Sequence, residues 1–154
     1  MVSFSKAFPT GLECGILNSN VKPGSRLAIV GSGPVGLAAM ITARLYSPSL
    51  VVVVDIEDSR LEHARRLGAY KTISMKGINA MEELRSIVSG KGFDAVIEAA
   101  GTSSSFELCQ RLLSPGATLA NIGVHGTDPT LAIGEIWDRN TSECVTAWLQ
   151  YPCL

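Results

Sequence analysis

The sequence lacks a surplus of basic residues, a long apolar run and a leader-like amino terminus. Its 154 residues include 13 Lys and Arg against 14 Asp and Glu, and the formal net charge is -1. A nucleic-acid-binding domain usually carries a basic surplus, and a membrane span needs roughly 18 consecutive apolar residues. Residues 1–10 show no basic region followed by an apolar block, so no signal peptide is visible. We therefore expect a cytoplasmic protein with neither a nucleic acid nor a membrane as its partner.

Cysteines are few and widely spaced. No two of the four form a Cys-x-x-Cys pair; they are Cys14, Cys109, Cys144 and Cys153. This spacing favours free thiols in a reducing compartment over disulfides, and it offers no structural zinc lobe. With 46% apolar and 18% charged residues, the chain has the composition of one ordinary folded domain.

Strand-like and helix-like segments alternate along the chain. A run such as 51–54, apolar on both faces, is typical of a parallel sheet that helices cover on both sides. The expected strands are 27–30, 51–55, 71–74, 93–98 and 117–122, with a sixth at 144–149, and the expected helices are 10–18, 34–46, 58–67, 79–88 and 104–113. This alternation predicts an α/β fold with a doubly wound parallel sheet of about six strands in the order 3-2-1-4-5-6. The ligand crevice of such a sheet lies at the carboxyl ends of its strands.

Three of the expected helices begin with residues that cap helices well. Thr10 and Asp58 precede apolar helical patterns, and the segment 104–107, Ser-x-x-Glu, has the form of a capping box. We divide the chain into a leading helix and turn over residues 1–25 and a single domain over residues 26–154.

A glycine-rich turn directly follows the first expected strand. Its sequence, Gly31-Ser32-Gly33-Pro34-Val35-Gly36, fits the pattern G-x-G-x-x-G and opens the next helix. Gly31 permits a tight turn, Gly33 lets the backbone approach a pyrophosphate, and Gly36 lets the helix lie close to the sheet. The free N–H groups and partial positive charge at a helix start favour phosphate binding. In this context the motif predicts a dinucleotide-binding Rossmann fold.

A carboxylate stands where such a fold binds the adenosine ribose. Asp55 ends the second expected strand, 19 positions after Gly36, where the motif calls for an acid about 20 residues on. It can accept hydrogen bonds from the ribose hydroxyls, and it would repel a 2′-phosphate by about 4 kcal/mol at ~4 Å and an effective dielectric near 20. NAD is therefore expected in preference to NADP. Arg60 could instead accommodate a phosphate, or it could pair with Glu57 on a solvated helix.

Further short motifs occur in one order along the chain. They are Pro9-Thr10-Gly11, Leu67-Gly68-Ala69, Ile97-Glu98-Ala99-Ala100-Gly101, Pro115-Gly116 and Asn121-Ile122-Gly123-Val124-His125-Gly126. Together with the glycine-rich turn and Asp55, they resemble the coenzyme domain of the zinc-dependent medium-chain alcohol dehydrogenases over roughly residues 8–140. The resemblance implies part of an oxidoreductase that transfers a hydride between an alcohol and NAD.

The resemblance implies a role for each matched position. The pyrophosphate would be covered by Ser32, Gly33, Pro34 and Val35, and the adenosine ribose would lie at Asp55 and Arg60. Along the bound cofactor would lie Ala100, Gly101 and Thr102, and near the nicotinamide Ile122, Gly123 and Val124.

The sequence also departs from the family's pattern. The family's zinc ligands lie mostly in a separate amino-terminal domain, and at the position of a further ligand this chain has Lys6, whose ammonium has no lone pair for a metal. We expect the catalytic zinc domain to be absent and zinc to be bound only in a full-length enzyme. The family's dimers join through the edge of the sixth strand. Because the tail from Thr141 departs from the usual β-branched strand, a homodimer through this edge is left open.

No other catalytic set replaces the metal. The chain has no Tyr-x-x-x-Lys, which excludes the mechanism of the short-chain dehydrogenases. His63 is expected to be solvated, and His125 is either a plain loop residue or a group near the nicotinamide. We therefore expect no catalytic residue and no metal ligand in this chain.

The leading hypothesis is an NAD(H)-binding domain of a zinc-type alcohol dehydrogenase, truncated naturally or cut from a longer chain. Alone, it should bind the cofactor without turnover. One alternative is a stand-alone nucleotide sensor, which the lack of catalytic residues favours. Another is an S-adenosylmethionine-dependent methyltransferase, which shares the glycine-rich loop and the strand-end acid. Competition between NAD and S-adenosylmethionine separates the last of these from the others.

Overall fold

The structure, a computed structural model, describes residues 2–136 and 142–145 of the chain. The helices are α1 (Val2–Pro9), its π-helical continuation η1 (Thr10–Leu17), α2 (Pro34–Ala43) with a short 3-10 extension η2 (Arg44–Tyr46), α3 (Asp58–Arg66), α4 (Ala80–Ile87), α5 (Ser103–Leu112) and α6 (Ile133–Ile136). The strands are β1 (Arg26–Val30), β2 (Leu50–Asp55), β3 (Lys71–Ser74), β4 (Phe93–Glu98), β5 (Leu113–Asn121) and β6 (Ser142–Val145). Strands and helices alternate from β1 to α5, as the sequence predicts.

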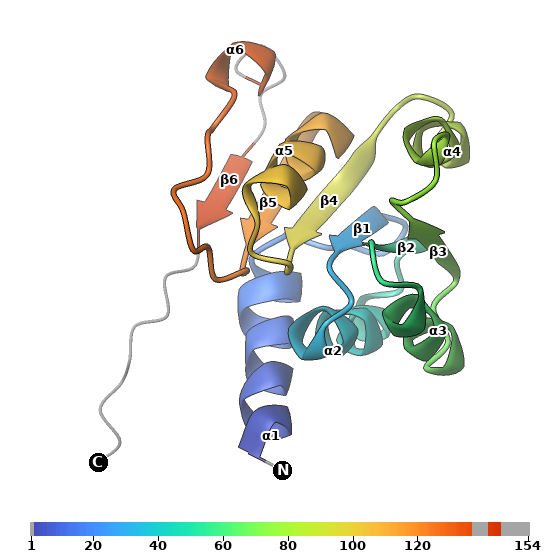
Figure 1. Cartoon of the computed structure of the whole chain (residues 1–154), viewed down its shortest axis with the longest axis vertical. Helices are drawn as coiled ribbons and strands as arrows, with labels where there is room; N and C mark the ends of the chain where they lie inside the picture. The colour runs from blue at the N-terminus through green and yellow to red at the C-terminus, as the bar shows by residue number, and fades with distance from the viewer. Residues whose placement is uncertain (1, 137–141, 146–154) are drawn as a thin grey trace.

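The strands form one parallel sheet in the order β3-β2-β1-β4-β5-β6. This order confirms the predicted doubly wound arrangement, in which the chain runs outward from β1 to β3 and then returns to the other side of β1. Five strands make up most of the sheet, and the short β6 pairs with β5 at one edge (Figure 1). β6 begins at Ser142, earlier than the predicted sixth strand, whose last residues, 146–149, lie outside the described part of the chain.

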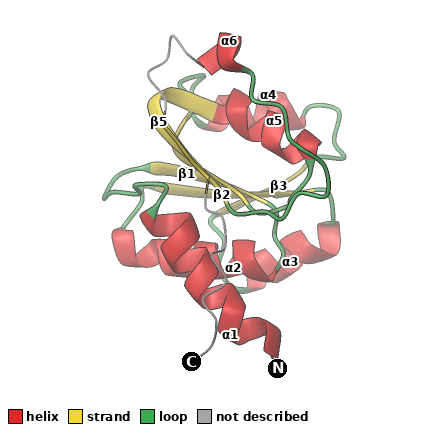
Figure 2. Cartoon of the chain, turned by 90° about the vertical axis from the view of Figure 1, so that its left-hand side faces the viewer, coloured by secondary structure: helices red, strands yellow, loops and turns green. Residues whose placement is uncertain are grey.

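Helices cover both faces of the sheet, with α4 and α5 on one face and α1, α2 and α3 on the other (Figure 2). The side chains of β1 alternate between the two resulting cores. Leu27 and Ile29 pack with Met40 of α2 and Leu61 of α3, whereas Ala28 packs with residues of α4 and α5. Because both faces are covered, the central strands β1 and β2 are largely apolar. The side chains of the sheet that can meet a ligand are therefore those at the ends of the strands.

The first helix begins earlier than the sequence predicts. It starts at Val2 and continues through Pro9 into η1, so Thr10 lies inside the helix and is not a cap. The Thr10 hydroxyl donates to the carbonyl of Lys6 at 2.8 Å. Pro9 has helical φ and ψ of -58° and -43°, so the local signal for a helix start at Thr10 is overridden and the helix runs through this position.

Two predicted caps are also displaced. Asp58 is the first helical residue of α3, and Glu57 is its N-cap without a side-chain cap bond. At α5 the capping box is formed by Thr102 and Ser105, whose side chains each bond the other's backbone N–H at 3.1 Å. The capping box predicted over residues 104–107 is not formed, because the run of serines offers several equivalent positions for the helix start. Glu107, its predicted acid, forms an ion pair with Arg111 along the helix.

The fifth strand begins directly after α5. Leu113 lies opposite Phe93, but the next pair is Thr118 with Ala95, so the pairing shifts across the intervening residues. Gly116 in that segment has a φ of +76°. The segment ends the helix as predicted, but the strand starts at Leu113 instead of the predicted position 117.

The described cysteines agree with the absence of disulfides in the sequence-based prediction. Cys14 and Cys109 form no disulfide, and Cys109, a residue of α5, is fully buried in the core. The predictions for Cys144 and Cys153 concern side chains outside the described set. Within residues 2–136 and 142–145, no helix is long and apolar enough to cross a membrane.

Candidate functional site

The glycine-rich turn joins β1 to α2 at the carboxyl edge of the sheet. Gly31 has a φ of +104°, and a Cβ there would lie 2.7 Å from the Ala100 nitrogen. A Cβ on Gly36 would collide with the carbonyl oxygen of Gly31. A Cβ on Gly33, the N-cap of α2, would meet no atom within 4 Å. Two of the glycines are thus required by packing inside the protein, while the third faces open space beside a helix N-terminus.

Asp55 is held directly beneath this turn. Its Oδ2 accepts hydrogen bonds from the Ser32 N–H at 2.6 Å and the Ser32 hydroxyl at 2.7 Å, and its Oδ1 accepts one from the Glu57 N–H at 2.9 Å. The residue is only 7% exposed. Burial by itself would raise the pKa of Asp55, but the bonds from Glu57 and Ser32, together with the charge of Arg60, outweigh it and hold that pKa below its ordinary value. The carboxylate is therefore ionised at neutral pH and already oriented.

A cleft of about 400 Å³ opens at this point, between the ends of β1, β2 and β4 and the start of α5. Six predicted site residues line it: Gly31, Gly33, Asp55, Arg60, Ala100 and Thr102. Apolar side chains of Ile56, Met75 and Leu108 line it as well. The cleft thus combines a helix N-terminus, a fixed carboxylate and an apolar wall at the edge where a doubly wound sheet binds its ligands.

The remaining predicted residues lie in α2 and in the two loops after β4 and β5. Pro34 and Val35 form the first turn of α2. Gly101, with a φ of +73°, lies so close to the backbone of Val124 that a Cβ would approach its nitrogen to 3.0 Å. Ile122 is only 8% exposed and packs into the core, whereas Val124 is 91% exposed. The structure brings the two loops together, with Val124 open to solvent.

One site residue was missed by the sequence reasoning. Glu98 ends β4 as Asp55 ends β2, and its side chain is fully buried. Its Oε1 accepts hydrogen bonds from the N–H groups of Ala100 and Gly101, at 3.0 and 2.9 Å, and from the hydroxyl of Ser105 at 2.6 Å. A charged residue closing an apolar strand, three positions before a glycine, was the available signal. Glu98 therefore shapes the loop that borders the cleft.

His125 lies on the other side of this carboxylate. Its Nε2 is 3.4 Å from Oε2 of Glu98 and 3.0 Å from Oδ1 of Asn121, and its ring meets the ring of Phe106 edge-on. The side chain is only 11% exposed. His125 is thus more than a plain loop residue, because its imidazole is folded inward among side chains.

Comparisons with known proteins bear on this architecture. A protein-family model described as "Zinc-binding dehydrogenase" matches residues 34–151. The chain belongs to the zinc-binding dehydrogenase family. An alcohol dehydrogenase from Cupriavidus necator strain H16 is 37% identical over 124 residues, and a sorbitol dehydrogenase from Bacillus subtilis is 34% identical over 117 residues. These matches take in 80% and 76% of this chain but 34% and 33% of the relatives, so the chain spans about a third of their length.

Among solved structures, the apo form of zinc-dependent alcohol dehydrogenase 2 from Streptococcus pneumonia superposes with a TM-score of 0.87 and 39% identity. The match covers 92% of this chain and 41% of that one. The predicted resemblance to the coenzyme domain of zinc-type medium-chain alcohol dehydrogenases is therefore confirmed. This part of the family binds a nicotinamide cofactor, NAD or NADP.

The described part of this dehydrogenase chain does not offer a zinc site. No group of three or more His, Cys, Asp or Glu side chains within it is placed to hold a metal ion. Lys6 is exposed on α1, and its ammonium cannot act as a ligand.

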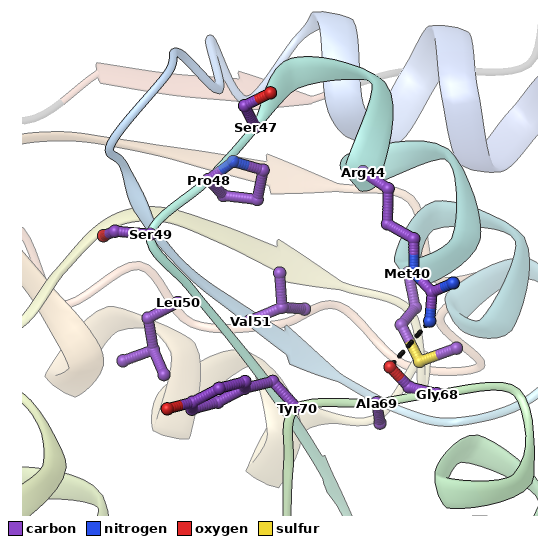
Figure 3. A pocket seen from close by; sticks show the side chains of 10 residues that line it. All are labelled: Met40, Arg44, Ser47, Pro48, Ser49, Leu50, Val51, Gly68, Ala69 and Tyr70. Atoms are coloured by element: carbon purple, nitrogen blue, oxygen red, sulfur yellow. Dashed lines mark hydrogen bonds between the residues drawn. The ribbon is translucent and has the colours of Figure 1, made fainter.

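A second cavity of about 310 Å³ lies at the opposite end of the sheet, where β2 begins (Figure 3). Arg44 closes one side of it by donating hydrogen bonds from Nη2 to the carbonyls of Leu67 and Gly68, at 2.9 and 2.7 Å. Its lining shares no residue with the cleft at the carboxyl edge. The two cavities are therefore separate, and only the carboxyl-edge cleft is lined by predicted site residues.

Proposed function

We propose that this chain is the cofactor domain of a zinc-type alcohol dehydrogenase that binds NAD(H) on its own and has no alcohol-oxidising activity by itself. In a complete enzyme it would hold the nicotinamide for hydride exchange with an alcohol. The observation that carries the proposal is the buried, ionised Asp55 bonded to the glycine-rich turn beside an open cleft. NAD supplies the hydride-accepting ring when it is bound, and the residues of this chain bind and orient it.

The start of α2 suits the pyrophosphate. The first N–H groups of a helix have no partner inside the helix, and its dipole places partial positive charge there. Pro34 occupies the first helical position, where its missing N–H is not needed. Because Gly33 carries no side chain and faces open space, phosphate oxygens can approach these N–H groups closely.

Asp55 suits a ribose that carries free hydroxyls. A carboxylate has about four lone-pair sites, and three of them accept bonds from Ser32 and Glu57. One site on Oδ1 is left for a ribose hydroxyl, and a second hydroxyl would have to displace the Ser32 hydroxyl. A 2′-phosphate would meet a fixed negative charge, which favours NAD over NADP despite the neighbouring Arg60.

The two ends of the cofactor suit different surfaces. Ile56, Met75 and Leu108 give the cleft an apolar wall for the adenine ring. The nicotinamide would lie toward the loops after β4 and β5, where Gly101 and Val124 meet. The alcohol site and a dimer through the β6 edge belong to the proposal for the complete enzyme, and a cytoplasmic location stays a prediction.

Gly33→Ala tests the proposal, because its added methyl group would point into open space and not into the protein. The variant should fold like the wild type and lose NAD affinity by at least about tenfold, since the methyl group would occupy the place of a phosphate oxygen. Gly134→Ala is the matched control, because a Cβ there also meets no atom within 4 Å. Calorimetric titration with NAD measures the affinity, and thermal melting checks the fold.

Three outcomes would contradict the proposal. Wild-type protein that binds no NAD would remove the function altogether. Equal NAD affinity for Gly33→Ala and the wild type would remove the pyrophosphate from the glycine-rich turn. Displacement of NAD by S-adenosylmethionine at similar concentration would support the methyltransferase alternative instead.

A further inference from the structure

The loops after β4 and β5 meet over one buried carboxylate. Glu98 ends β4 and is inaccessible to solvent. Its Oε1 gathers the N–H groups of Ala100 and Gly101 and the hydroxyl of Ser105, which fixes the first loop and the first turn of α5. Hydrogen bonds to a charged group contribute more than those between neutral groups. One oxygen of Glu98 is therefore committed to the loop that borders the cleft.

The other oxygen faces the second loop. Oε2 of Glu98 has no hydrogen-bond partner among the described residues, and Nε2 of His125 lies 3.4 Å away. The same Nε2 lies 3.0 Å from Oδ1 of Asn121 at the end of β5, so the imidazole stands between this amide and the carboxylate. A Cβ on Gly123 would collide with Oε2. The second loop is thus shaped around the carboxylate and is attached to it through His125.

A buried pair of a carboxylate and an imidazole contributes little net stability to the fold, because burying the charge is itself costly. Removing a carboxylate from water is expensive, and apolar replacements are often as stable. The position of Oε2, with His125 as its neighbour, is better explained by the geometry that it imposes. The imidazole holds the backbone of residues 123–125 against Gly101, where the carbonyl and nitrogen of Val124 lie in contact with the first loop.

We propose that Glu98 and His125 are positioning residues that align the two loops for the nicotinamide half of the cofactor. The proposal rests on the proposed function, because it takes the nicotinamide to lie along residues 100–102 and 122–124. Neither side chain reaches the cofactor itself, since one is fully buried and the other nearly so. They act through the backbone of the loops. Asp55, at the proposed adenosine ribose, lies on β2, and its hydrogen bonds run to Ser32 and Glu57 and not to this pair.

The test compares NAD with ADP-ribose, which has both phosphates and the adenosine but no nicotinamide. His125→Leu removes the donor and keeps an apolar side chain against Phe106. NAD affinity should fall about five- to tenfold, the effect of losing one ordinary hydrogen bond, while ADP-ribose affinity should change less than about twofold. His125→Gln restores a donor and should recover most of the NAD affinity. His63→Leu, at the other histidine of the chain and exposed on α3, is the matched control.

A general loss of structure would give a different result from a positioning role. Equal loss of NAD and ADP-ribose affinity in His125→Leu, or no loss of either, would overturn the inference while leaving NAD binding by the wild type intact. Wild-type protein that binds neither ligand would refute the proposed function, and the inference with it. If His125→Leu fails to fold, Glu98→Gln takes its place and must weaken NAD more than ADP-ribose. The fluorescence of bound NADH gives an independent readout, because a displaced loop should change the nicotinamide signal.

Discussion

Asp55→Asn tests whether a single buried charge selects the cofactor. In the wild type, three hydrogen bonds of 2.6 to 2.9 Å from Ser32 and Glu57 fix the carboxylate at the end of β2. Asparagine has nearly the same shape without the charge. The substitution therefore removes the electrostatic term and keeps most of the packing.

The expected size of the change in cofactor affinity follows from Coulomb's law. Two unit charges ~4 Å apart repel by about 4 kcal/mol at an effective dielectric near 20, which corresponds to roughly a thousandfold in affinity. Salt screens this repulsion only slightly, because the Debye length at physiological ionic strength, about 8 Å, exceeds the distance between the two charges. The bond from a ribose hydroxyl to the carboxylate is worth about 1.5–3 kcal/mol. Asp55→Asn should therefore weaken NAD by about ten- to a hundredfold, strengthen NADP and bring the two affinities close together.

Calorimetric titrations of both cofactors measure the ratio directly. Asp58→Asn is the control, because Asp58 is exposed at the first position of α3 and its loss changes the net charge by the same one unit. The NAD-to-NADP ratio should collapse in Asp55→Asn and persist in Asp58→Asn. An unchanged ratio in Asp55→Asn, or an equal change in both variants, would refute the reasoning.

Two further predictions concern stability. Gly36→Ala should prevent stable folding, unlike Gly33→Ala, because its Cβ would collide with the Gly31 carbonyl; a cooperative melt near that of the wild type would contradict this. The Arg26 side chain, through its hydrogen bonds, holds the pKa of Asp94 below its ordinary value, so the folded pKa lies below the unfolded one. The stability that ionised Asp94 contributes is fully present above about pH 4. It is lost as the pH falls further, through the lowered pKa that Asp94 has in the folded state. Asp94→Asn should therefore reduce the free energy of unfolding by about 1 kcal/mol near pH 7 and less at pH 3; urea titrations at both pH values measure this, and an equal loss at both would count against it.

The sheet could be predicted because its signals are local and redundant. The run at β2 and the centre of β4 are apolar on both faces, which is typical of a covered parallel sheet, and each is followed by a helical pattern. The helix starts could not be predicted as well. At α5, Thr102 and three serines in a row all suit an N-cap, and the choice depends on Ser105 also bonding Glu98 across the loop. That contact is tertiary and leaves no local pattern.

The early start of the first helix has a similar cause. Thr10 is a good N-cap residue and favours a helix start at its own position. In the structure, Gly11 lies so close to α2 that a Cβ would approach the Ala39 nitrogen to 2.6 Å. The helix is thus stabilised by packing on α2, which overrides the preference of its own residues.

Asp55 and Glu98 give the same signal in the sequence, and their surroundings decide which of them lines a ligand cleft. Both are acids at the carboxyl end of a buried strand, and both accept backbone N–H bonds from the following loop. Asp55 lines an open cleft and keeps a lone-pair site on Oδ1 for a ligand, whereas Glu98 is sealed by the loop after β5 and His125. Strand order explains the difference: β2 is flanked by β1 and the short β3, while β4 lies between β1 and the long β5, whose following loop covers it. We propose that the same residue type binds a ligand at one strand end and organises the protein at the other, and the NAD and ADP-ribose titrations of His125→Leu and Asp55→Asn should separate these roles.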